Sequence, residues 1–184
     1  MQLTAIFESW LIWDKAYTPF SKGEAVNLSF RMDTQRLEWC PAGLEEFTHI
    51  RDAEYRFRGR VILVYSSEEK PFVVVETLGF RFYTNGRHLR PLQLGYRNPG
   101  DWVVGEGTLL LDYGDWFSHG IHDPNLFFKL LVKNIWKVNR LGDSERMPLD
   151  TMKGRNVDEE LYIIDFDDVG LSGEAIPRTL GHGA

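Results

Sequence analysis

Apolar and polar residues alternate with a period of two along several stretches of the chain, as they do in β-strands that bury one face. The clearest stretch is AVNLSFRM, residues 25–32, where every second residue from the valine onward is apolar. Residues 3–13 are rich in β-branched and aromatic side chains and predict an earlier strand. Between residues 33 and 54 the alternation fails around a Cys-Pro-Ala-Gly sequence, which predicts a loop with at most one helical turn.

The strongest hairpin pattern lies in the middle of the chain. Two β-rich runs, residues 55–66 and 71–84, are joined by a short polar connection of hairpin length. One face of this hairpin is aromatic and the other carries arginines, so a register shift of one residue would bury charged side chains. The aromatic pairs expected across the hairpin are Tyr65 with Phe72, Phe57 with Phe80, and Tyr55 with Phe82.

The second half of the chain predicts further strands. Residues 101–112 have a strand pattern that contains Gly105 and Gly107, and glycines inside a strand usually mark a bulge or a bend. Residues 126–139 fit both a strand and a helix with lysines on one face, and their β-branched residues favour the strand. Residues 161–168, LYIIDFDD, predict a short edge strand, because aspartates discourage pairing between sheet edges.

Together these strands predict a mainly β protein built on a small antiparallel β-barrel, since no convincing helix connects them. The arrangement over residues 23–140 resembles the architecture of an OB-fold barrel, without a motif of any particular family. Residues 1–142 are expected to form the barrel domain. Residues 143–184 are expected to form an acidic, flexible C-terminal extension made of a linker, the short edge strand and a disordered tail.

Charge and cysteine content narrow the compartment and the class of partner. The net charge is −6, and the acidic excess lies after residue 142. Nucleic-acid binding needs a basic face, which this overall charge does not favour. Cys40 is the only cysteine and cannot form an internal disulfide, and neither a signal-peptide pattern nor an apolar run long enough to span a bilayer is present. We therefore expect a cytoplasmic protein that does not bind membranes.

The loop that follows residues 101–112 concentrates side chains that can bind a metal. Imidazoles and carboxylates are ligands of zinc and of non-haem iron, and such an ion with a bound water would give a metal-dependent hydrolase. The spacing lacks the His-Glu-x-x-His pattern of helical zinc sites, so a polar connecting loop is the simpler interpretation. The candidate ligands are Asp112, Asp115, His119, His122 and Asp123.

Two surfaces are candidates for binding a macromolecule. In the same loop, Trp116 and Phe117 either fold back onto the barrel or form an apolar contact surface. On the hairpin, arginines at alternate positions beside Tyr83 would combine a cationic stripe with an aromatic ring, which suits an oligonucleotide backbone and a stacked base. The simpler interpretation of that face is a solvated outer sheet surface. The arginines are Arg56, Arg58, Arg60 and Arg81.

Catalytic motifs give no competing signal. The chain has no Walker loop, Rossmann fingerprint or nucleophile elbow, and nothing in the pattern supplies an oriented base for Cys40. The leading hypothesis is therefore a non-enzymatic, cofactor-free binding module whose partner is a protein. The alternatives are a hydrolase that holds a divalent metal such as zinc in residues 112–123, and oligonucleotide binding through the arginine face.

Overall fold

The computed structural model describes residues 1–13, 17–65, 72–85, 98–112, 126–139, 145–152 and 161–171. Strands make up 72% of these residues, which confirms the mainly β class. The helix α1 (Trp10–Trp13) has four residues, and no helix among the described residues is long and apolar enough to cross a membrane. The contacts divide the chain into two compact units, one of residues 1–29 with 112–184 and one of residues 30–111.

Residues 30–111 contain a closed barrel of five strands, which confirms the predicted barrel. The ring runs in the order β3, β7, β6, β5, β8 and closes through the pairing of β8 with β3. Every pairing is antiparallel except that of β3 with β7, which is parallel. A further strand, β4 (Glu46–Arg51), pairs with the first half of β5. The barrel strands are β3 (Phe30–Cys40), β5 (Glu54–Tyr65), β6 (Phe72–Thr77), β7 (Phe80–Asn85) and β8 (Trp102–Leu111).

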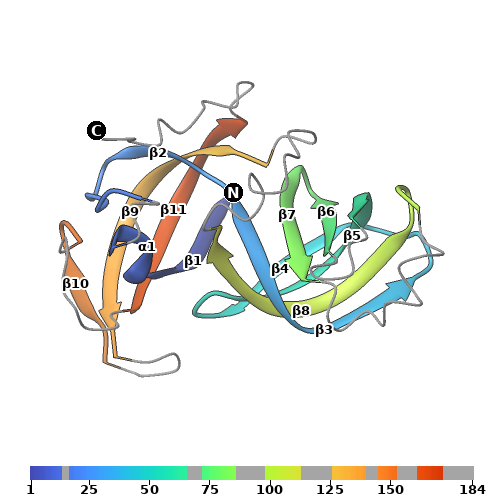
Figure 1. Cartoon of the computed structure of the whole chain (residues 1–184), viewed down its shortest axis with the longest axis horizontal. Helices are drawn as coiled ribbons and strands as arrows, with labels where there is room; N and C mark the ends of the chain where they lie inside the picture. The colour runs from blue at the N-terminus through green and yellow to red at the C-terminus, as the bar shows by residue number, and fades with distance from the viewer. Residues whose placement is uncertain are drawn as a thin grey trace. The chain divides into compact units, whose positions relative to one another are not determined.

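The glycines of β8 allow the barrel to close. In Figure 1, β3 and β8 run side by side as two long curved strands, and β8 also pairs with β5 on its other edge. A Cβ atom on Gly105 would lie 2.6 Å from Phe57 Cζ and 2.7 Å from the Arg36 carbonyl oxygen. Opposite Gly107, the register of β3 shifts by one residue after Thr34. The predicted bend at these glycines is confirmed.

The barrel interior is aromatic, although two of the three predicted cross-strand pairs are wrong. Tyr65 pairs with Phe72 as expected, and their rings stack with centroids 4.8 Å apart. Residues 71–84 are not one strand, because Leu78 and Gly79 adopt positive φ angles of 50° and 78° and turn the chain into β7. Phe57 and Phe82 instead meet inside the barrel from strands that are not neighbours, with ring centroids 4.9 Å apart, and Tyr55 stacks on Phe47 of β4.

Residues 33–54 are strand where the sequence predicts loop. The strand β3 continues to Cys40, and β4 follows from Glu46. Two features hide the alternation of β3 in the sequence. Thr34 occupies a buried position, where its hydroxyl lies 3.0 Å from the hydroxyl of Thr84. The register shift after Thr34 then makes Leu37 the next buried residue. A buried, hydrogen-bonded threonine reads as polar in the sequence.

The second unit is a sheet centred on β9 (Phe128–Val138) and β11 (Leu161–Leu171), which lie side by side in Figure 1. One edge of β9 pairs with β11 and the other with β2 (Ala25–Leu28) and β10 (Met147–Leu149). The strand β1 (Gln2–Glu8) pairs with the far edge of β11. The strand predicted for residues 126–139 is confirmed.

Four expectations for this unit are corrected. The first strand ends at Glu8, after which α1 begins, and Ser29 separates β2 from β3 within the single strand expected over residues 25–32. Residues 161–171 form a central strand between β9 and β1, and not an edge strand. The chain does not divide at residue 142, because β10 and β11 pair with β9 and β1 and so belong to the same unit as the N-terminal strand.

Candidate functional site

Three of the four arginines predicted as a binding face lie on the barrel as charged pairs with glutamates of neighbouring strands. Arg60 and Arg81 stand directly opposite Glu76 in β5 and β7, at 3.0 Å and 2.6 Å from its two carboxylate oxygens. Arg56 stands opposite Glu106 of β8, at 2.8 Å. Opposite charges facing each other across strands stabilise a sheet. The cationic stripe expected from sequence is thus interleaved with carboxylates.

Arg58 and Tyr83 also differ from the expected binding surface. The Arg58 guanidinium donates a hydrogen bond of 2.7 Å to the carbonyl oxygen of Pro41. The Tyr83 side chain is 7% exposed, and its ring packs edge-on against Phe72 at 5.7 Å. A buried ring cannot stack on a base, so the proposed aromatic platform at Tyr83 is wrong. The alternation could not show this, because nothing near Tyr83 in the sequence indicates that Phe72 will pack against its ring.

Glu76 is the central charge of this surface. Partial burial raises its pKa, but hydrogen bonds from Arg81 and Arg60, together with their charges, outweigh this effect and leave the pKa below its usual value. A carboxyl whose pKa is lower in the folded state stabilises the fold above the unfolded-state pKa, and that contribution is lost as the pH falls through the folded-state pKa.

We expect Glu76→Gln to lower the free energy of unfolding by about 1 kcal/mol at pH 7, because the amide keeps the shape and loses the charge. The difference from the wild-type protein should narrow as the pH is lowered from 7 towards 3, where the wild-type carboxylate is increasingly protonated. Urea unfolding at several pH values measures both effects. Glu38→Gln is the control, since its pair with Arg36 is exposed and a smaller change is expected there. A difference independent of pH would contradict this account.

Asp112 is the one candidate metal ligand that lies within the described residues. Its side chain is fully buried and accepts a hydrogen bond of 3.0 Å from the Ser29 hydroxyl. Its backbone N–H donates to the Ser29 carbonyl oxygen, and its own carbonyl oxygen accepts the hydroxyl of Tyr17. These contacts hold Asp112 to Tyr17 and Ser29 of its own unit, which is a structural role.

The other residues of that loop lie outside the part of the chain that the structure describes. They are the predicted ligands Asp115, His119, His122 and Asp123 and the aromatic residues Trp116 and Phe117. Among the described residues, no three histidine, cysteine, aspartate or glutamate side chains come together as metal ligands. The metal site and the aromatic contact surface of this loop stay predictions.

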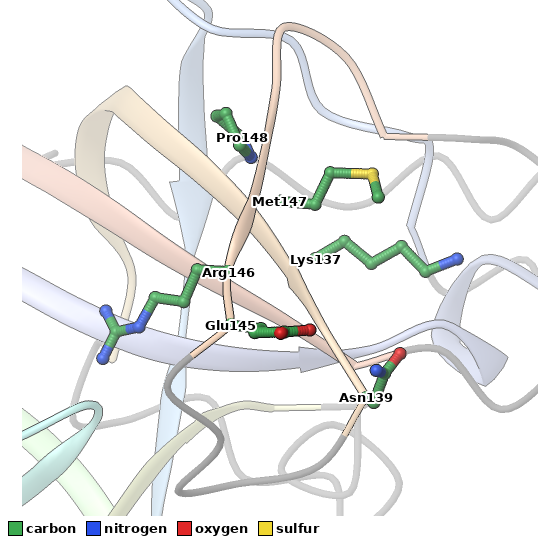
Figure 2. A pocket seen from close by; sticks show the side chains of 6 residues that line it. All are labelled: Lys137, Asn139, Glu145, Arg146, Met147 and Pro148. Carbon is green, nitrogen blue, oxygen red and sulfur yellow. The ribbon is translucent and has the colours of Figure 1, made fainter.

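A cleft of about 540 Å³ lies beside β10, in the unit that contains β9. Figure 2 shows that the Lys137 amine and the Arg146 guanidinium point in opposite directions. Two cations that diverge do not form a binding site for a phosphate or carboxylate group, which needs converging donors. The cleft is lined by Lys137, Asn139, Glu145, Arg146, Met147 and Pro148.

Three exposed apolar side chains lie in or beside β4. Leu44 is 90% exposed, Ile50 is 48% exposed and Leu78 is 58% exposed. The turn that carries Leu78 is fastened to the start of β4, because the Leu78 N–H donates a hydrogen bond of 2.6 Å to the Glu45 carboxylate. We call Leu44, β4 and Leu78 together the β4 edge. Sequence reasoning missed this surface because it placed these residues in a loop and within a continuous strand.

Comparison of the chain with protein-family models, with curated proteins and with solved structures finds no match. The functional argument therefore rests on the described residues alone.

Proposed function

We propose that this protein is a non-enzymatic, cytoplasmic binding module whose partner is a protein. The observation that carries the proposal is the contrast between two barrel surfaces. Glu76 and Glu106 pair with three of the four arginines of the arginine face, whereas the β4 edge exposes three large apolar side chains. Exposed apolar groups that gather on one surface are typical of protein contacts. The cytoplasmic assignment rests on Cys40, a free thiol that needs no oxidising compartment.

The pairing order of the barrel supports an OB-like architecture for this module. The strands β5, β6 and β7 form a three-stranded meander, the last of them runs parallel to β3, and β8 joins β3 to β5. We infer an OB-like ring with a different order along the chain. The strand in the position of β3 comes last in an OB-fold, whereas β3 comes first among the barrel strands of this chain. Such a barrel accepts many kinds of ligand, so the surface residues decide the partner.

The test is a capture experiment with the full chain in a lysate of the cells that make it. We expect a cross-linked partner protein that is lost when Leu44→Asp and Leu78→Asp are combined, because both changes place a charge in the contact. Aspartate tolerates the positive φ of residue 78, so the variant should fold, which circular dichroism checks. Met147→Asp is the matched control, since Met147 is 61% exposed in the other unit.

The same protein should bind a labelled single-stranded oligonucleotide weakly if at all. Tight binding of a dT 20-mer by fluorescence anisotropy, with affinity that falls steeply as salt is raised, would overturn the proposal. Such binding would favour the arginine face, and not the β4 edge, as the functional surface.

A further inference from the structure

The β4 edge lies at the end of the described strand order of its unit. Among the described residues, β4 pairs with β5 alone, so its other edge has no strand beside it. Unpaired edges are usually protected by charged residues, proline or bulges. The strand Glu46–Arg51 has charged residues at its two ends and a register shift near Arg51, which leaves its middle residues without such protection. Of the five large hydrophobic side chains that are exposed in the described part of the chain, three belong to this surface. An open edge and an apolar surface therefore coincide.

Leu78 gives an independent indication that this surface has a use. Its φ angle is +50°, a conformation that suits asparagine or glycine at a hairpin turn and costs a bulky side chain about 1 kcal/mol or more. Its side chain is mostly exposed, so burial in the barrel does not offset that cost. The turn between β6 and β7 explains the conformation but not the choice of leucine, and a strained residue that folding does not require is an indication of function.

The charge around β4 is acidic. Residues 41–54 contain Glu45, Glu46, Asp52 and Glu54 against the cation Arg51, and Arg58 of β5, whose guanidinium donates to the Pro41 carbonyl oxygen, adds a second cation. The Arg51 guanidinium is already paired with Glu54 at 2.7 Å. Surfaces that bind each other carry complementary charge, so the partner of this edge should be basic.

We propose that the β4 edge binds an extended segment of another protein, which carries apolar side chains and lysines or arginines and adds to β4 as a further strand. This inference rests on the proposed function and specifies its partner. Strand addition supplies main-chain hydrogen bonds, and alternate side chains of the segment supply specificity. Leu44 and Ile50 are six residues apart along an extended chain, about 20 Å, so a segment of about seven residues covers the edge and reaches both.

The test uses defined peptides and the full chain. A labelled, end-capped heptapeptide of alternating lysine and valine should bind at least tenfold more tightly than the peptide of alternating glutamate and valine, measured by fluorescence anisotropy. Replacing the central residue of the basic peptide with proline should weaken binding at least tenfold, because proline cannot donate to a strand ladder. Hydrogen–deuterium exchange should show slower exchange of β4 amides with the basic peptide. Equal binding of the basic and acidic peptides, or unchanged exchange in β4, would overturn the proposal.

Variants of the chain distinguish strand addition at the β4 edge from the broader proposal of a protein-binding module. Leu44→Lys combined with Ile50→Lys should weaken binding of the basic peptide at least tenfold, while Met147→Lys in the other unit leaves the binding affinity unchanged. If no peptide binds but the captured partner is still lost on substitution of Leu44 and Leu78, strand addition is overturned and the protein-binding module stands. If the peptide binds and slows amide exchange in β4, but no captured partner is lost when the β4 edge is substituted, strand addition stands and the proposed function is wrong.

Discussion

Gly107→Ala is expected to lower the free energy of unfolding by about 3 kcal/mol, the upper end of the usual cost of overpacking. An added Cβ would lie 2.5 Å from the Asp33 carbonyl oxygen and 2.8 Å from Thr34 Cα. Both are backbone atoms of β3, which cannot rotate away as a side chain does. The strands β3 and β8 would have to separate at the point where the barrel closes.

Urea unfolding followed by circular dichroism measures this loss in the full chain. Gly43→Ala is the matched control, because its added Cβ would meet only the Arg58 guanidinium, the far end of a flexible side chain. We expect a change within about 0.5 kcal/mol there. Equal losses in the two variants would show that the β3 backbone accommodates the added Cβ atom without extra cost.

The sequence predicted those parts of the barrel whose geometry depends on single residues or on residues close in the sequence. Gly105 and Gly107 marked the bend of β8, and Tyr65 with Phe72 fixed the register at the end of the hairpin. The parts that were missed depend on contacts between distant residues. Nothing near Thr34 in the sequence shows that Thr84 will satisfy its hydroxyl inside the barrel. A polar residue at a buried position therefore ended the predicted strand too early.

The candidate site shows the same limit. The arginines of β5 and β7 were visible as an alternating pattern, but one of the carboxylates that pair with them, Glu106, comes from β8, some fifty residues away from Arg56. Their pairing turns the expected stripe of free cations into a ladder in which two carboxylates hold three of the four arginines. The β4 edge was not predicted, because its apolar residues are dispersed among polar neighbours and Leu78 joins them only through the Glu45 hydrogen bond.

The aspartates of β11 misled the sequence analysis for a related reason. In the sequence they indicate an exposed edge, yet Asp165 lies in a central strand. Donors from both neighbouring strands solvate its carboxylate: the hydroxyl of Thr4 at 2.9 Å, the Asn134 amide at 3.1 Å and the Trp136 indole N–H at 3.2 Å. A charged group can occupy the middle of a sheet when its hydrogen bonds are satisfied.

Asp165→Ala is therefore expected to lower the free energy of unfolding by about 3 kcal/mol. The substitution removes three hydrogen bonds to a charged acceptor and leaves partly buried donors on β1 and β9 without it. Urea unfolding at pH 7 measures the loss, and indole fluorescence reports the change around Trp136.

Asp167→Ala is the control in the same strand. Its carboxylate pairs with Lys133 at 2.9 Å, and both side chains are more than 40% exposed, at 42% and 46%, so a loss of less than about 1 kcal/mol is expected. Combining Asp165→Ala with Asn134→Ala should cost less than the sum of the single losses, because both remove the same hydrogen bond. Additive losses, or an Asp165→Ala effect no larger than that of Asp167→Ala, would mean that the three donors find water when the carboxylate is absent.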